Sequence, residues 1–183
     1  MRRVNAFVTA LLFLLFLVHL IRGGLILIGA VQGGNTLFTI ITHSMLTLLM
    51  VHVLIGTVLT VQTVMTVRRS GTFYMKENRM FLIRRISGFA LMFFMVSHVM
   101  IFSGSNVSGA YRLTLFDAPA LISQILLVIC LLIHLGCNIR PLGISLGIDG
   151  SDGKRTDAVI VLSILLLLGG IAFFVYYFMW SAI

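Results

Sequence analysis

Residues 5–31 read NAFVTALLFLLFLVHLIRGGLILIGAV, a long apolar stretch with a single histidine, His19. A helix that crosses the hydrocarbon core of a bilayer needs roughly 20 mostly apolar residues, and this stretch is long enough. It follows a basic start, MRR, as in a signal peptide. However, it exceeds an h-region of ~7–15 residues, and no clear small-residue cleavage site follows it. We therefore expect a retained membrane-spanning helix.

Four further stretches have the same character, at about 37–67, 81–103, 118–143 and 157–181. Of the 183 residues, 60% are hydrophobic and only 10% are charged, whereas a soluble domain has about 25% charged residues. The sequence therefore predicts an all-α integral membrane bundle of five transmembrane helices. It forms a single membrane domain over residues 1–183 and leaves no length for a separate soluble catalytic domain.

Polar or glycine-rich breaks separate the five stretches. The expected breaks are a short turn at 32–35, a basic loop at 68–79, a nearly neutral loop at 104–117 and a hydrophilic turn at 149–155. Asp117 with Pro119 is typical of a helix start, because a capping oxygen or an early proline suits a helix N-terminus. Thr156 or Asp157 has the same character before the fifth stretch.

The basic residues are distributed unevenly over the two sides of a five-span arrangement. Only Arg22 and Arg112 fall towards one side. The other side has eleven: Arg2, Arg3, Arg68, Arg69, Lys76, Arg79, Arg84, Arg85, Arg140, Lys154 and Arg155. This bias predicts a cytoplasmic N-terminus and an external C-terminus. The net charge of +8 does not indicate a nucleic-acid partner, because the charges lie in short loops rather than on a continuous basic face.

All five histidines fall inside predicted spans. They are His19 in the first, His43 and His52 in the second, His98 in the third and His134 in the fourth. Ionisable groups are costly in hydrocarbon and normally mark function. A lone histidine could simply bond to a neighbouring helix, but histidines on four helices favour a shared role.

The depths of these histidines indicate what the role is. At ~1.5 Å per residue, His52 and His134 both lie roughly 25 Å from the outer boundary, and His19 and His98 lie nearer the outside. Two histidines from two helices at equal depth can ligate one haem iron from both faces. The sequence therefore predicts two b-type haems in two layers. It has no Cys-x-x-Cys-His motif for covalent c-type attachment.

Two residues near the outer layer have open roles. His43 lies nine residues before His52, which is half a turn out of phase at 100° per residue, so it cannot face the same haem edge. It either donates a hydrogen bond to a quinone carbonyl, contacts a haem propionate, or is a structural histidine. Arg22, one turn after His19, either neutralises an outer haem propionate or extends to the interface.

Several motifs together resemble a known family. The most specific is Arg84-Arg85-Ile86-Ser87-Gly88, with Ser97-His98-Val99 ten residues later. The others are HVLIG at 52–56, Tyr74-Met75 in the basic loop, and His134 followed by Arg140. Over nearly its whole length, the chain is similar to the dihaem cytochrome b membrane anchor of succinate:quinone oxidoreductases. This is the single-subunit, five-helix type of succinate dehydrogenases and fumarate reductases.

The resemblance implies a cofactor arrangement and a location. His19 and His98 would be the axial iron ligands of an outer haem b, and His52 and His134 those of an inner one. The arginines near inner haem propionates or the partner interface would be Arg3, Arg85 and Arg140. The substrate would be menaquinone or another quinone, and the location the cytoplasmic (inner) membrane of a prokaryote.

The resemblance also implies two cytoplasmic partners, a flavoprotein with covalent FAD and an iron–sulfur subunit. The chain would pass electrons between membrane quinone and these partners. It would have no complete catalytic site of its own and would contribute the quinone site of an oxidoreductase complex. Electron flow in either direction is consistent with this interpretation.

Two other functions agree less well with the sequence. The cytochrome b subunits of hydrogenases, formate dehydrogenases and nitrate reductases usually have two ligands on one helix or a ligand on a terminal helix, and the fifth stretch here has no histidine. A histidine-relay transporter or proton channel predicts broken helices or mid-span carboxylates. None of the acidic residues lies mid-span: Glu77, Asp117, Asp149, Asp152 and Asp157.

The missing carboxylates are also a departure from the family, because some dihaem anchors use membrane-embedded carboxylates near the haems for proton movement. Position 132, two residues before the fourth histidine, is leucine. We therefore expect no carboxylate proton path beside the inner haem. His43 is then the best available side chain for quinone protonation at the outer side.

Overall fold

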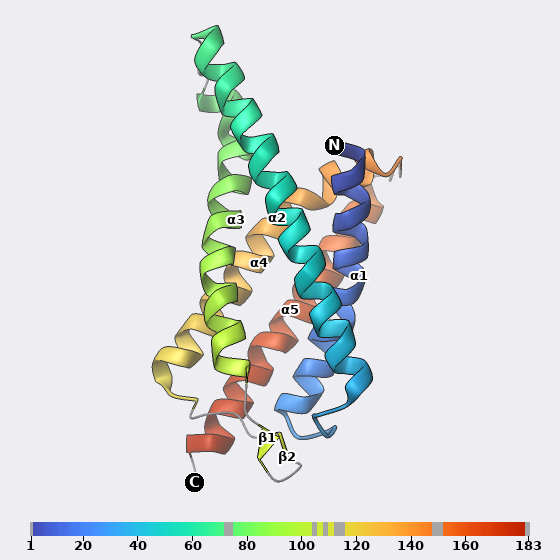
Figure 1. The fold of residues 1–183 in the computed structure, drawn as a ribbon, viewed down its shortest axis with the longest axis vertical. Coiled ribbons are helices and arrows are strands. Elements are labelled where there is room, and N and C mark those ends of the chain that lie inside the picture. The colour runs from blue at the N-terminus through green and yellow to red at the C-terminus, as the bar shows by residue number, and fades with distance from the viewer. Residues whose placement is uncertain are drawn as a thin grey trace.

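The computed structural model describes residues 2–71, 75–103, 106–107, 110–111, 116–147 and 152–181. The helices of this part of the chain are α1 (Arg2–Leu27), α2 (Thr36–Ser70), α3 (Met75–Phe102), α4 (Ala118–Ser145) and α5 (Asp152–Ser181). All five are long and apolar enough to cross a membrane, so the predicted five-helix membrane fold is confirmed. Two short strands, β1 (Asn106–Val107) and β2 (Ala110–Tyr111), pair antiparallel between α3 and α4 (Figure 1).

The first two helix ends are set by polar and glycine residues rather than by the limits of the apolar stretch. α1 stops at Leu27, four residues before the predicted end, because Gly29 adopts a left-handed conformation with φ of 74°. Such a glycine ends a helix readily. α2 begins at Thr36, where Oδ1 of Asn35 accepts hydrogen bonds from the backbone N–H groups of Leu37 and Phe38.

The predicted basic loop at 68–79 is wrong over most of its length. α2 continues through Arg68 and Arg69 and ends before Gly71, whose φ is 66°. α3 already begins at Met75. Charged residues such as arginine and lysine are good helix formers, so a polar stretch beyond the membrane does not have to leave the helix. The two helices extend together past the ends of the other helices (Figure 1).

The two predicted starts of the later helices had different outcomes. Asp117 caps α4 as predicted, and its Oδ1 accepts from the backbone N–H of Ala120 at 2.9 Å. α5 begins at Asp152 rather than at Thr156 or Asp157, so most of the hydrophilic turn is helical. Arg112, one of the two basic residues expected on the outer side, lies outside the described residues.

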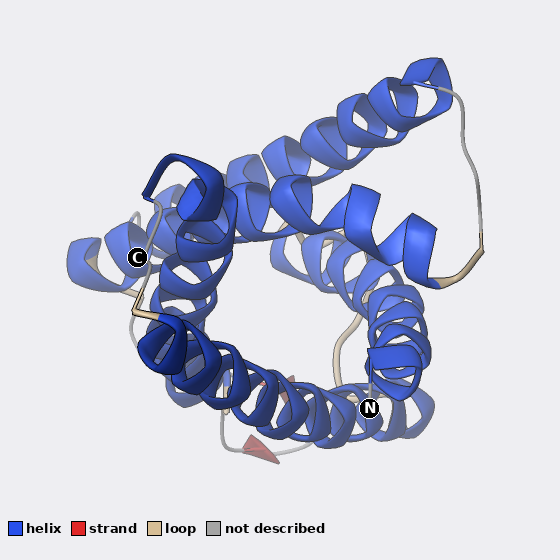
Figure 2. Ribbon diagram, turned by 90° about the horizontal axis from the view of Figure 1, so that it is seen from above, coloured by secondary structure: helices blue, strands red, loops and turns tan. Residues whose placement is uncertain are grey.

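The helices pack in an order that differs from their order in the chain. α2 packs on α1, α1 on α5, α5 on α4, and α4 on α3, with a smaller contact between α1 and α4. Within the described residues, no packing of comparable extent joins α2 to α3. Seen from above, the helices surround a central region (Figure 2). The bundle is therefore an open ring, and its two unjoined ends are α2 and α3.

The buried apolar core lies mainly between α4 and α5. One cluster contains Leu127 and Leu131 of α4 with Leu162 and Leu166 of α5. Many large side chains on the outer surface are exposed and apolar, as a lipid-facing surface requires. The start of α1, the end of α2 and the start of α3 lie at one end of the bundle, and the end of α5 lies at the other (Figure 1).

Candidate functional site

His19 of α1 and His98 of α3 lie beside each other. Their ring centroids are 6.0 Å apart, and the ring planes meet at 77°. An imidazole nitrogen lies about 2 Å from a bound metal and the ring centre about 1 Å behind it, so two rings on opposite sides of one ion are about 6 Å apart. The centroid separation of this pair therefore suits a metal ion held between the rings.

His52 of α2 and His134 of α4 face one cavity with a volume of about 330 Å³. The cavity lies in the seam between α2 and α3, where the ring of helices is open. Its polar lining lies near one end and includes Thr60, Arg84 and Arg85, and the rest is mostly leucine, valine, methionine and phenylalanine. Cavities of roughly 300–1,000 Å³ commonly hold small molecules. This one would suit an apolar ligand with acidic groups at one end.

The same four histidines share a pattern of hydrogen bonds, because Nδ1 of each meets a side-chain oxygen from another helix. The partners are Thr42 for His19 (3.5 Å), Thr9 for His52 (3.0 Å), Gln124 for His98 (2.7 Å) and Ser87 for His134 (3.2 Å). Among the described residues, no hydrogen bond engages Nε2 of any of the four. Each ring is therefore held by one nitrogen and offers the other.

The direction of these hydrogen bonds follows from the hydroxyl groups. The Thr9 hydroxyl donates to the carbonyl of Asn5 at 2.7 Å, and the Thr42 hydroxyl donates to that of Phe38 at 2.9 Å. Ser87 likewise donates to the carbonyl of Arg84 at 3.2 Å. With its single hydrogen on the backbone carbonyl, each hydroxyl oxygen accepts from the histidine. In this arrangement the Nδ1 atoms of His19, His52 and His134 are donors, and Nε2 has a free lone pair.

Two of the predicted arginines accompany the two histidine pairs. Arg22 lies over the ring of Phe38 at 5.5 Å, and Phe38 itself stacks on His19 with centroids 5.7 Å apart. Arg85 lines the cavity of the other pair and donates from Nη1 to the carbonyl of Gly56 at 3.3 Å. In both arginines Nε is buried with no partner among the described residues. A buried unpaired donor on a cation suggests an anionic partner.

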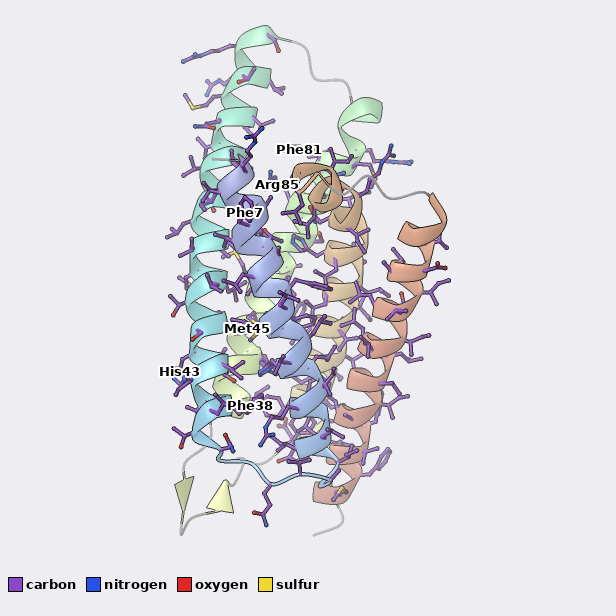
Figure 3. The ribbon with its side chains drawn as sticks, turned by 90° about the vertical axis from the view of Figure 1, so that its right-hand side faces the viewer. Phe7, Phe38, His43, Met45, Phe81 and Arg85 are labelled. Carbon is purple, nitrogen blue, oxygen red and sulfur yellow. The ribbon has the colours of Figure 1, made fainter. Side chains whose placement is uncertain are left out.

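The remaining predicted site residues have exposed side chains. Arg3 and Arg140 are exposed, and neither is among the residues that line the cavity of His52 and His134. His43 is also exposed, and its Nδ1 donates to the carbonyl of Thr39 in its own helix at 2.8 Å. Figure 3 shows His43 pointing outward from α2, away from the neighbouring helices. The predicted difference in helical phase between His43 and His52 is confirmed.

Each histidine pair supplies two nitrogen ligands, the number that a haem iron would need from the protein. In the described part of the chain, no group of three or more His, Cys, Asp or Glu side chains is placed to hold a metal ion. The porphyrin itself supplies four iron ligands, so two imidazoles are enough for haem. Gly88 also leaves room for an unhindered ring, because a Cβ there would lie 3.3 Å from Cε1 of His134.

Sequence reasoning missed Thr9, Thr42 and Gln124, the hydrogen-bond partners of three histidines. Gln124 had a usable signal, because it is a primary amide inside an apolar stretch and such groups seek partners on other helices. The two threonines had none, since threonine is common in membrane helices and bonds readily to its own backbone. No model of a protein family, no curated protein and no solved structure matches the chain, so its function is argued from its own residues.

Proposed function

We propose that the chain is the dihaem b membrane anchor of a succinate:quinone oxidoreductase, a succinate dehydrogenase or fumarate reductase, in the cytoplasmic membrane of a prokaryote. The motif at 84–98 and the four histidines carry the resemblance to this family. The observation that carries the proposal is the hydrogen-bond pattern shared by His19, His52, His98 and His134. Each meets a side chain of another helix through Nδ1, and none has a hydrogen bond at Nε2 among the described residues.

In this proposal the two pairs would hold two haems at two depths. His19 and His98 would hold the outer haem, and His52 and His134 would hold the inner one. Haem supplies one-electron transfer through its iron. The chain's own residues fix the imidazole rings by the Nδ1 bonds, a contact that also makes a ligating nitrogen more basic.

The arginines would neutralise the acidic edges of the two haems. Arg85 and Arg84 line the polar end of the cavity, so the inner propionates are proposed to point to that end. Arg22 and His19 both contact the ring of Phe38, so Arg22 would serve the outer haem. Pairing with carboxylates would satisfy the buried Nε atoms of Arg22 and Arg85, which have no described partner.

Partners are proposed at the end of the bundle where α2 and α3 extend past the other helices. Exposed Arg68, Arg69 and Arg79 lie on these extensions. By the positive-inside bias this end is cytoplasmic, where the iron–sulfur and flavoprotein subunits would dock. A quinone exchanges electrons with the haems from within the membrane, and His43 on the lipid-facing side of α2 is a proposed contact.

The test is a reduced-minus-oxidised absorption spectrum of the purified chain, together with its haem-to-protein ratio. We expect a b-type α-band and two haems per chain. His43→Ala is the matched control and should keep both haems, because His43 faces away from the pairs. A spectrum without a b-type α-band would falsify the proposal. Copurification of a flavoprotein and an iron–sulfur protein distinguishes this complex from other haem-containing membrane oxidoreductases.

A further inference from the structure

Gln124 is the most deeply buried polar side chain in the described part of the chain, with 0% of its surface exposed. The other buried residues of α4 are apolar: Ala120, Leu121, Leu127 and Leu131. A buried amide is costly unless it is hydrogen-bonded. The hydrogen bonds of Gln124 therefore have to explain why an amide is buried at this position of α4.

A backbone carbonyl, which can only accept, decides which groups around Gln124 donate and which accept. The Ser123 hydroxyl donates to the carbonyl of Ala120 at 2.9 Å, so its oxygen can only accept from other groups. It accepts from Ser97 at 3.1 Å and from Nε2 of Gln124 at 2.9 Å. The amide of Gln124 thus has its NH₂ group fixed toward Ser123 and its oxygen toward His98.

His98 must consequently donate from Nδ1 to Oε1 of Gln124. This contact is 2.7 Å long, whereas the corresponding contacts of His52, His134 and His19 are 3.0, 3.2 and 3.5 Å. It is also the only one of the four made to an amide oxygen rather than a hydroxyl. A shorter bond to an acceptor that is itself fixed withdraws more of the Nδ1 proton and makes Nε2 a stronger electron donor.

We propose that Gln124 is a positioning residue for His98 that lowers the reduction potential of the outer haem. The proposal rests on the proposed function, because it needs His98 to be an axial ligand. A more basic imidazole stabilises the ferric iron more than the ferrous iron. Gln124 therefore makes the outer haem a better electron donor than His98 would without this contact.

The experiment is a spectroscopic redox titration of both haems in the purified complex. Gln124→Met removes the acceptor at similar volume and should raise the outer midpoint potential while the inner midpoint stays unchanged. Gln124→Glu keeps an oxygen at this position and should return the outer midpoint to the original value or below it. Leu127→Met is the control for packing, because Leu127 is also buried in α4, and it should move neither midpoint.

The outcomes separate the two proposals. Two bound haems with an unmoved outer midpoint in Gln124→Met overturn the role of Gln124 and leave the proposed function intact. If Gln124→Met loses the outer haem, Gln124→Glu has to restore it, and a failure to do so also overturns the role. Absence of haem from the unchanged protein overturns both proposals together.

Discussion

Nε of Arg84 donates a hydrogen bond of 3.1 Å to the carbonyl oxygen of Cys137 and so ties α3 to α4. This carbonyl lies four residues before Pro141, which is inside α4 and has no N–H to offer it. The proline thus leaves an acceptor in the helix, and the arginine of the neighbouring helix satisfies it. In a membrane such a group cannot turn to water instead.

The Arg84–Cys137 bond predicts a coupled pair of substitutions. Arg84→Leu should lower the free energy of unfolding by about 1–2 kcal/mol, the range of interhelical hydrogen bonds in membranes. Adding Pro141→Ala should recover part of this loss, because the backbone of an alanine can supply the missing N–H group within α4. Unfolding in mixed detergent micelles measures both effects. Arg140→Leu, an exposed arginine on the same helix, is the control, and additive effects of the first two substitutions would contradict the coupling.

The pairing of histidines predicts which substitutions are equivalent. His19→Ala and His98→Ala should each remove the same haem, and adding the second to the first should cause no further loss. His52→Ala and His134→Ala should each remove the other haem, and combining them should cause no further loss. The low-temperature α-band and the haem-to-protein ratio report which haem remains. Loss of different haems from His19→Ala and His98→Ala would show that the pairs are wrongly assigned.

Gly88 predicts a steric effect on one haem only. A Cβ at this position would lie 3.3 Å from Cε1 and 3.6 Å from Nδ1 of His134, so Gly88→Ala pushes on the imidazole ring. Overpacking of this kind costs about 1–3 kcal/mol, and we expect weaker retention of the inner haem with the outer one unaffected. The haem content after washing in detergent measures the retention of the inner haem. Gly136→Ala, where the new Cβ meets nothing within 4 Å, should leave both haems in place.

Substitution of Arg22 and of Arg85 should shift the midpoint potentials of different haems. Arg22→Gln should lower the midpoint potential of the outer haem, and Arg85→Gln that of the inner haem. A positive charge disfavours the more positive ferric state, so its removal stabilises that state. A tenfold change in the one-electron equilibrium corresponds to about 60 mV, and we expect shifts of this order. Equal shifts of both haems in either variant would argue against these positions, and Arg140→Gln should shift neither.

The sequence was sufficient for the five spans, because apolar length accumulates along one helix. Apolar length sets where a helix can cross a membrane, and rise per residue sets the depth of His52 or His134. The helix ends at 68–79 were less predictable, since arginine and lysine are polar and also favour helix. Hydropathy therefore marks the end of the apolar stretch but not the end of the helix.

The contacts around each histidine depend on how the helices are rotated about their axes, and this is fixed by packing between helices. Thr9 meets His52 only because α1 and α2 present these faces to each other. Gln124 meets His98 across α3 and α4 for the same reason. The family resemblance implied that Arg3 and Arg140 lie near the inner haem propionates or at the partner interface, and their side chains are exposed. The rotation of α2 also separates His43 from the other four histidines.

The open seam between α2 and α3 has a consequence for the order in which the protein is made. These helices follow each other in the chain, so they leave the ribosome one after the other, yet each packs mainly on a different neighbour. The α1–α2 and α3–α4 hairpins can therefore form separately as they enter the bilayer. A cofactor bound in the seam by His52 and His134 would join the two hairpins after insertion, without any helix leaving the membrane.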